Sequence, residues 1–133
     1  MTFRTLHATR LRHVIFSAVL GAAVFAAASL GARGQNLDQV QQLLTTKNCP
    51  GCDLHNAQII DKNLNRADLK GANLSGAILY KTTLHDAALK GANFAGADLR
   101  GTDLNGARNA NLTGAQTNEF TTCPNGKAGP CAG

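Results

Sequence analysis

The chain has 133 residues, of which 44% are apolar and 16% are charged, a length that holds one ordinary domain. Its formal net charge is +5, but four of the basic residues lie before position 35, where no Asp or Glu occurs, and the rest of the chain is nearly neutral. This balance excludes a nucleic-acid binder held by neutralised phosphates, and the absence of Trp together with a single Tyr excludes a base-stacking surface.

Residues 1–34 are predicted to form a secretory signal peptide. Arg residues precede position 14, an uncharged apolar run extends from Val14 to Leu30, and small residues follow, which is the order of a signal sequence. The run is shorter than the stretch of about 20 residues that spans a membrane as a helix, so we expect cleavage, with a retained signal anchor as the alternative. The mature chain is therefore expected to be periplasmic or secreted, with no stable membrane insertion after cleavage.

Residues 35–48 are predicted to form an N-terminal capping helix. Apolar residues recur at helical spacing from Leu37 to Leu44, and Asn36 is a suitable N-cap residue with Gln39 three positions later. An amphipathic helix of this kind can lie across the start of the segment that follows it and cover the apolar interior of that segment.

A large apolar residue recurs at every fifth position of the next segment, and a small residue stands two positions before most of them. The series is Leu54, Ile59, Leu64, Leu69, Leu74, Leu79, Leu84, Leu89, Phe94, Leu99 and Leu104. Five residues advance a helical stripe by roughly 140° and place successive side chains on opposite faces of a strand, so neither regular element buries this pattern. A coil that turns a corner every five residues does, because every apolar side chain then points to one axis.

Several repeats carry the clearest form of this pattern. They are Ala67-Asp68-Leu69, Ala72-Asn73-Leu74, Ala92-Asn93-Phe94 and Ala97-Asp98-Leu99. These repeats resemble the signature A-(D/N)-L-x-x of the pentapeptide-repeat family. The resemblance implies an all-β solenoid, a right-handed quadrilateral β-helix with four pentapeptides, or about 20 residues, in each coil. We expect this β-helix over residues 49–119, with a break of register at Asn109, and an irregular C-terminal cap or tail over residues 120–133.

Residues one coil apart are expected to stack in columns. The columns that support this stacking are Lys62 with Thr82 and Thr102, Arg66 with Asp86, and Asp61 with Lys81. The last two columns place opposite charges over one another. Lys62 occupies a position that nominally points inward, so its side chain must reach solvent or pair with a neighbour.

The cysteines lie beyond the signal peptide, at Cys49, Cys52, Cys123 and Cys131, and in an exported chain disulfides are the default expectation. The fold that the resemblance implies separates the first pair from the last by about three and a half coils, or roughly 17 Å. That distance is too long for a disulfide or a shared zinc site. The implied pairs are Cys49–Cys52 and Cys123–Cys131, and similar cysteines in exported family members imply that they staple the coil ends.

The segment Cys49-Pro50-Gly51-Cys52 also allows an alternative function, that of a periplasmic thiol–disulfide oxidoreductase. Reactive Cys-x-x-Cys pairs stand at the N-terminus of a helix, where the helix dipole stabilises the thiolate, whereas this pair follows a predicted helix. A structural disulfide is the preferred interpretation. Covalent haem attachment is excluded because Asp53 stands where a His is needed.

Ile60, Tyr80 and Arg100 occupy one outward column and form the predicted interaction patch. His55 and His85 are expected to be surface residues on different faces. The Asp residues that precede central apolar residues are expected to stabilise turns, and they are Asp53, Asp68, Asp98 and Asp103. No catalytic, cofactor-binding or metal-ligating residue and no cofactor is predicted. The expected function is that of a non-enzymatic, exported structural or protein-interaction module, with a protein partner and no nucleic acid.

Overall fold

The computed structural model describes residues 37–131, all of which belong to one compact unit, Gly34–Gly133. The predicted signal peptide over residues 1–34 and the predicted N-cap residue Asn36 lie outside the described residues. Within the described range, no helix combines the length and the apolar character needed to cross a bilayer.

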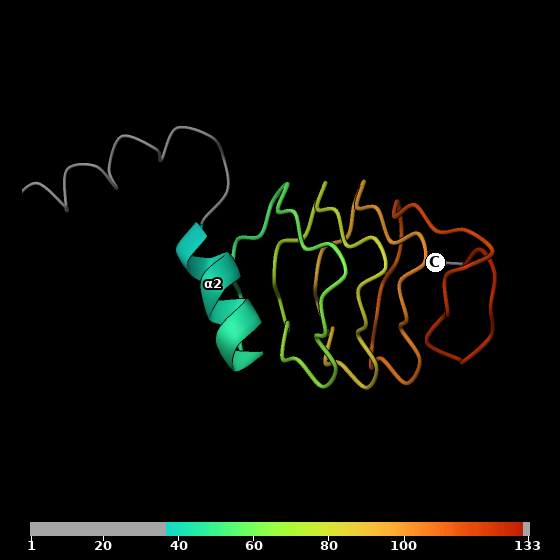
Figure 1. The fold of residues 1–133 in the computed structure, drawn as a ribbon, viewed down its shortest axis with the longest axis horizontal. Helices are drawn as coiled ribbons and strands as arrows, with labels where there is room; N and C mark the ends of the chain where they lie inside the picture. Colours follow the sequence, from blue (N-terminus) through green and yellow to red (C-terminus); the bar gives the residue numbers. More distant parts are fainter. Residues whose placement is uncertain (1–36, 132–133) are drawn as a thin grey trace, which may run out of the picture. The chain divides into compact units, whose positions relative to one another are not determined.

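The capping helix α2 spans Leu37–Thr46 and is followed by the successive coils of the chain (Figure 1). Leu43 is fully buried against the core, whereas Leu37 is 61% exposed, so the predicted apolar stripe packs only from its second turn onward. The helix ends earlier than predicted because Lys47 adopts a left-handed φ of 55°, which stops the helical backbone.

Two glutamine side chains of α2 satisfy backbone groups at the start of the first coil. The Gln39 side-chain oxygen accepts a hydrogen bond from the Asp53 backbone N–H, and the Gln42 amide donates to the Asn48 carbonyl at 2.9 Å. Unpaired backbone groups at the end of a β stack invite association with other chains. The helix therefore covers both the apolar interior and part of the polar rim of the first coil.

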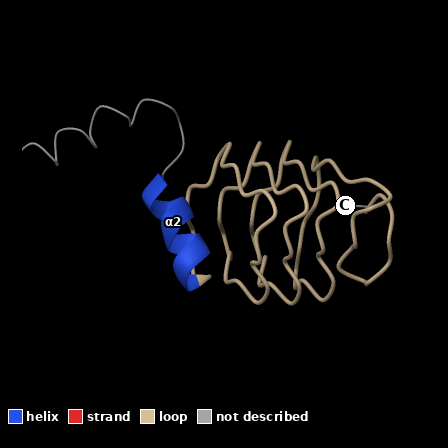
Figure 2. Cartoon of the chain, viewed as in Figure 1, coloured by secondary structure: helices blue, strands red, loops and turns tan. Residues whose placement is uncertain are grey.

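Parallel β-bridges join each coil to the next and link residues four pentapeptides apart, as in Asn48–Asp68, Asp68–Ala88 and Ala88–Arg108. This spacing confirms the predicted coil of four pentapeptides. Each side of a coil contributes a single bridge residue between two corners, so the described residues contain no extended strand and the cartoon draws the coils as loops (Figure 2). The β character predicted for the fold resides in these stacked bridges.

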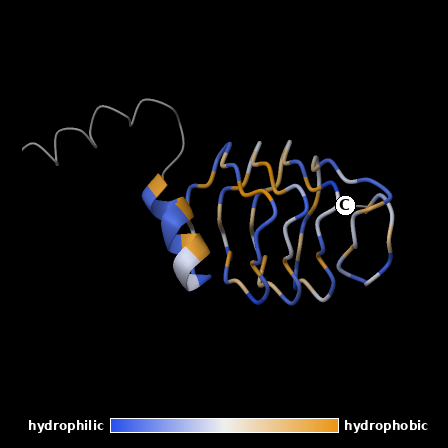
Figure 3. Cartoon of the chain, in the orientation of Figure 1, coloured by the Kyte–Doolittle hydropathy of each residue, from blue (hydrophilic) through white to orange (hydrophobic). Residues whose placement is uncertain are grey.

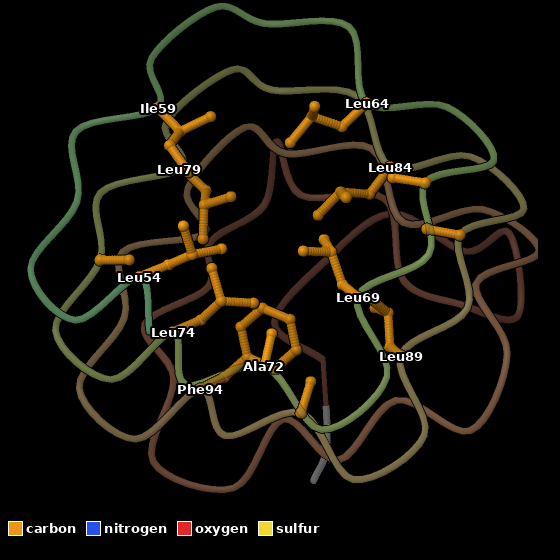
Figure 4. Close-up of a cluster of buried hydrophobic side chains, with 14 of the residues drawn as sticks. Leu54, Ile59, Leu64, Leu69, Ala72, Leu74, Leu79, Leu84, Leu89 and Phe94 are labelled. Atoms are coloured by element: carbon orange, nitrogen blue, oxygen red, sulfur yellow. The ribbon is translucent and has the colours of Figure 1, made fainter. Parts of the chain in front are cut away.

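The eleven central residues from Leu54 to Leu104 point into the coil and are at most 1% exposed. Their apolar positions repeat in register from one coil to the next (Figure 3). Residues one coil apart lie in the same column, so that Leu54, Leu74 and Phe94 stack, as do Leu69 and Leu89 (Figure 4). The predicted inward register is confirmed, and the narrow aliphatic interior explains the scarcity of aromatic residues in the repeats.

A left-handed residue stands two positions after each central residue and forms the corner. At the Leu54 corner this residue is Asn56, with φ of 56°, and the Ala57 N–H donates to the Leu54 carbonyl at 3.0 Å, as in a type II turn. In the next coil the same place is taken by Gly76, where an added Cβ would lie 2.3 Å from Asn56 Oδ1. Glycine is favoured at Gly76 by its φ of 66° and by the Asn56 side chain stacked over it, which would have to shift to admit a Cβ.

The Lys62 side chain is exposed, which is one of the two outcomes expected for a lysine at a nominally inward position. The corner before it is not closed by a backbone hydrogen bond. The buried hydroxyl of Thr82 lies between the two ends of this corner. It donates a hydrogen bond to the Ile59 carbonyl and accepts one from the Lys62 N–H. The Thr82 hydroxyl of the next coil closes the corner, and the Lys62 side chain remains in solvent.

The oppositely charged residues that stack in adjacent coils, Arg66 with Asp86 and Asp61 with Lys81, are not joined by ion pairs among the described residues. Among the described residues, the ion pairs join Asp68 to Lys70, His85 to Asp86, and Asp98 to Arg100. Each joins residues of one coil that are one or two positions apart. The residues before and after a central residue both point outward on the same face, which brings their charges closer together than the corner residues of adjacent coils.

The last coil is shorter than the others, by two residues at the bridge Asp98–Gln116 and by one at the bridge Asp103–Thr122, and the chain then closes with a hairpin. The bridge Asp98–Gln116 falls two positions short of four pentapeptides, and Leu112 is buried in the column of Phe94. The tail predicted to be irregular is instead ordered, because Thr122 pairs with Asp103 in parallel and with Ala128 in antiparallel orientation. Its loop is Pro124-Asn125-Gly126, and the left-handed Gly126, with φ of 78°, suits a three-residue hairpin.

Candidate interaction surface

The structure brings the predicted patch residues Ile60, Tyr80 and Arg100 together on one face of the coil. They line a hollow of about 410 Å³, with Ile78 and Asp98 completing its wall. Ile60 is 42% exposed and Tyr80 is 37% exposed. The residues of this column come from three consecutive coils, and the fold positions each of them directly after a buried central residue.

Phe120 extends this surface and was not predicted to belong to it. It is 72% exposed and shares a second hollow of about 510 Å³ with Tyr80, Lys81, Arg100, Gly101 and Asn118. Asn118 anchors the Phe120 segment to the coil, because its Oδ1 accepts the N–H groups of Gly101 at 3.1 Å and of Phe120 at 3.2 Å. Phe120 directly precedes Thr121, which bonds to the Leu99 carbonyl as Thr102 bonds to the Leu79 carbonyl, so Phe120 occupies the corner position that Gly101 has in the preceding coil, and the five-residue period gave no signal for it.

We name this surface the Tyr80 face, formed by Ile60, Ile78, Tyr80, Lys81, Asp98, Arg100, Asn118 and Phe120. The large hydrophobic side chains that are exposed in the described part of the chain are Leu37, Ile60, Tyr80 and Phe120. All except Leu37 lie on the Tyr80 face, so exposed apolar surface is concentrated on one side of the coil.

Asp98 fixes the orientation of the Arg100 side chain. Arg100 Nε lies 2.9 Å from Asp98 Oδ1, and Nη2 lies 2.7 Å from Oδ2. This two-point contact holds the pKa of the Asp98 carboxyl below its usual range, with the guanidinium hydrogen bond as the largest cause, and it raises the pKa of Arg100. The guanidinium is thereby presented in one fixed orientation on the face.

Lys81 adds a second cation to the Tyr80 face. Its Nζ lies 5.2 Å from the centroid of the Tyr80 ring, within the range of a cation–π contact. Lys81 and Arg100 both line the larger hollow, whose wall contains no carboxylate. The face therefore combines aromatic rings with two positive charges, one of which is balanced by Asp98.

The aspartates of the repeat act as turn residues, as predicted. The side chains of Asp53, Asp68, Asp98 and Asp103 each accept the backbone N–H two positions later. In Asp68 this bond, from the Lys70 N–H, is the main reason why the pKa is lowered. Such bonds rigidify the outward edge of each coil, and the carboxylates are dispersed over different faces.

His55 and His85 contact neighbours on separate faces. His55 Nδ1 lies 2.9 Å from Ser75 Oγ, and His85 Nδ1 lies 2.9 Å from Asp86 Oδ2. Within residues 37–131, no group of three or more His, Cys, Asp or Glu side chains is placed to hold a metal ion.

Both ends of the coil carry a disulfide. Cys49–Cys52 has a Cα–Cα distance of 5.4 Å and lies between α2 and the first coil. Cys123–Cys131, at 5.5 Å, closes the C-terminal hairpin. Cys49 is fully buried and Cys52 is 6% exposed, so the first disulfide is shielded from other molecules.

Stacked corners of five residues, with one small and one large side chain turned inward, define a solenoid repeat protein. A family model for pentapeptide repeats matches eight copies, over residues 48–86, 67–106 and 83–116. The chain therefore belongs to the pentapeptide-repeat family. No curated protein matches the chain.

Solved structures of pentapeptide repeat proteins are also similar to this chain. A protein from the Arabidopsis thaliana thylakoid lumen is 32% identical, with a TM-score of 0.48, over 60% of this chain and 57% of its own length. A protein from the cyanobacterium Cyanothece 51142 is 22% identical, with a TM-score of 0.32, over 64% of this chain and 97% of its own. A Nostoc protein is 26% identical, with a TM-score of 0.24, over 64% of this chain and 77% of its own.

Proposed function

We propose that this chain is an exported, non-enzymatic interaction module that presents the Tyr80 face to a protein partner. The observation that carries the proposal is the concentration of exposed Ile60, Tyr80 and Phe120 around two hollows on one face. Apolar side chains gathered in this way mark sites of association. Tyr, Phe and Arg are also the residue types enriched where proteins meet.

A non-enzymatic role is supported by how the reactive side chains are used. The repeat aspartates accept backbone hydrogen bonds within their own turns. The alternative, a thiol–disulfide oxidoreductase, needs a thiolate that is accessible to a substrate protein. Burial of Cys49 and Cys52 beneath α2 and the first coil argues against this alternative.

An oxidising compartment is supported by the two disulfides, because such bonds form and persist outside the cytosol. Together with the predicted signal peptide, they favour a periplasmic or secreted protein without a membrane anchor after cleavage. From Gln35 onward the sequence is nearly neutral, which favours a protein partner over a nucleic acid.

Site-specific photo-crosslinking in cells tests the proposal. We would place p-benzoylphenylalanine at Tyr80, where it keeps an aromatic ring, and at Lys90, an exposed position on another face, as the matched control. We expect protein adducts from position 80 that are absent or much weaker from position 90. Equal labelling from both positions, or no adduct from position 80, would overturn the proposal.

A further inference from the structure

We infer that the Cys123–Cys131 disulfide is a site of reversible thiol–disulfide exchange, and that its reduction by a dithiol releases the end of the chain from the coil. This inference goes beyond the proposed function, because it concerns the C-terminal hairpin and does not involve the Tyr80 face. It is carried by the different burial of the two disulfides and by the few contacts that hold the hairpin closed.

The two disulfides differ in how far a reductant can reach them. Cys49 is fully buried, Cys52 is 6% exposed, and Cys49 Sγ lies 3.5 Å from the Gln39 carbonyl of α2. The second disulfide lies at the end of the stack opposite α2 (Figure 1), where Cys123 is 8% exposed and Cys131 is half-buried. Exposed disulfides are the ones that exchange readily. The C-terminal disulfide is therefore the accessible one.

The return strand of the hairpin, residues 127–131, has few contacts with the rest of the protein. Its residues before Cys131 are exposed or half-buried, and among the described residues after Cys123, Cys131 is the one that packs against the apolar core. Its backbone hydrogen bonds go to Thr121 and Cys123, and the Cys131 N–H donates to Thr117 Oγ1 at 3.0 Å. A two-stranded hairpin alone is marginally stable. The return strand therefore depends on the disulfide for its attachment.

The first strand of the hairpin is attached to the coil independently of the disulfide. Thr122 forms a parallel bridge with Asp103 of the preceding coil. The buried hydroxyl of Thr121 donates to the Leu99 carbonyl at 3.0 Å. Reduction is therefore expected to release the return strand and to leave the coil and its apolar interior folded.

The return strand covers the last hydrogen-bonding edge of the stack. The Cys123 N–H donates to the Lys127 carbonyl at 2.8 Å, and the Gly129 N–H donates to the Thr121 carbonyl at 3.0 Å. These bonds take the place of the bonds that a further coil would make. Once the return strand leaves, the Cys123 N–H and the Thr121 carbonyl are free to pair with an added strand. The redox state of the disulfide thus determines whether this edge is closed or open.

The exchange needs a dithiol and no other reactant. A thiolate of the dithiol attacks the sulfur of Cys131, the more exposed cysteine, and the S–S bond breaks with its electron pair on Cys123 Sγ, which takes a proton from water. The second thiolate of the dithiol then attacks the dithiol sulfur of the mixed disulfide, and Cys131 leaves as a thiolate that is protonated in turn. The protein disulfide is reduced to two thiols, and the dithiol is oxidised to a disulfide.

Selective reduction of the native protein tests the exchange. Protein purified from the exported fraction would be treated with dithiothreitol without denaturant, quenched, alkylated with N-ethylmaleimide and mapped by mass spectrometry. We expect Cys123 and Cys131 to be labelled at least about tenfold faster than Cys49 and Cys52, the matched control in the same chain. Equal rates, faster labelling of the first pair, or no labelling without denaturant would overturn the inference.

Amide hydrogen exchange followed by NMR tests the release of the return strand. Reduction should accelerate exchange of the Gly129 and Cys131 N–H groups at least about tenfold. The Gly101 N–H, which donates to Asn118 Oδ1 in the coil, should keep its rate. The Cys123→Ser, Cys131→Ser variant should give the same pattern without reductant. Unchanged exchange at Gly129 after reduction would show that the return strand stays in place and would refute the switch.

Discussion

The hydroxyl of Thr102 donates a hydrogen bond of 2.8 Å to the carbonyl of Leu79, which belongs to the preceding coil. Thr82 and Thr121 form equivalent bonds to the carbonyls of Ile59 and Leu99. All three threonines are fully buried. One corner of the coil is thus joined from each turn to the next by side-chain hydroxyls as well as by the backbone, and the hydroxyls of these three threonines are all satisfied.

Thr82→Val should destabilise the fold more than Thr102→Val. Valine keeps the shape of threonine but removes its hydroxyl. In Thr102→Val the Leu79 carbonyl retains the Thr82 N–H as donor, so we expect a loss of about 1 kcal/mol. In Thr82→Val both the Ile59 carbonyl and the Lys62 N–H lose a partner, for a loss of about 2–3 kcal/mol.

Urea unfolding monitored by circular dichroism measures both losses. Thr113→Val, at an exposed position of the last coil, is the control and should change the free energy of unfolding by less than about 0.5 kcal/mol. Equal losses for the two buried threonines would show that the Thr82 hydroxyl does not close the Lys62 corner.

Leu79→Asp should unfold the solenoid. Leu79 is fully buried among aliphatic side chains. An unpaired carboxylate at this position loses its hydration, which costs several kcal/mol. Ile78→Asp, one residue earlier and facing outward, should have a mild effect. Thermal melts compare the two variants, and similar losses would contradict the inward register.

The Cys49→Ser, Cys52→Ser double variant should melt at a lower temperature than the parent and associate more readily. The closed loop is short, so its direct entropic contribution is modest, but its loss loosens the junction between α2 and the first coil and exposes an edge. Differential scanning calorimetry and light scattering measure the two effects. Neither protein should reduce insulin with dithiothreitol above background, and activity in the parent alone would favour the oxidoreductase.

The ion pair of Asp98 with Arg100 should make stability depend on pH in the acid range. The Asp98 pKa is lowered in the folded state from its ordinary value of 3.8. The Asp98 carboxylate therefore binds a proton less tightly in the folded protein than in the unfolded chain. The stabilisation is complete above the unfolded-state pKa and is lost as pH falls through the folded-state pKa. We expect the stability difference between wild type and Asp98→Asn to shrink from pH 6 to pH 2 in urea titrations, and a constant difference would refute it.

The mature chain should begin within residues 27–36. The reason is the predicted signal peptide, whose small residues after the apolar run offer cleavage sites. Intact-mass spectrometry of the protein purified from the exported fraction measures the start of the chain. A mass that still includes Val14 to Leu30 would show that the segment is retained as an anchor.

The five-residue period predicted the coil and its buried register, because a corner every five residues turns every central residue inward, and the resemblance to the pentapeptide-repeat family implied four pentapeptides per turn. The same reasoning did not predict how the corner before Lys62 is closed, because the hydrogen bonds of the Thr82 hydroxyl to another coil leave no pattern in the sequence. Phe120 was missed because the last coil departs from the five-residue period and places Phe120 at a corner that Gly101 occupies in the preceding coil. The hairpin at Pro124-Asn125-Gly126 has a recognisable loop, but its pairing with Asp103 depends on contacts distant in the chain.

The constant spacing of the bridges from Asn48 to Arg108 limits how the length of this chain can change. Duplication or loss of a whole coil within this range preserves every column and alters only how many residues each column contains. Insertion or deletion of a single pentapeptide keeps the interior intact but rotates everything after it by one side. An insertion of one pentapeptide after Tyr80 would move Arg100 to a different face from Ile60 without disturbing the core. Such an insertion therefore changes the surface of the protein more than its stability.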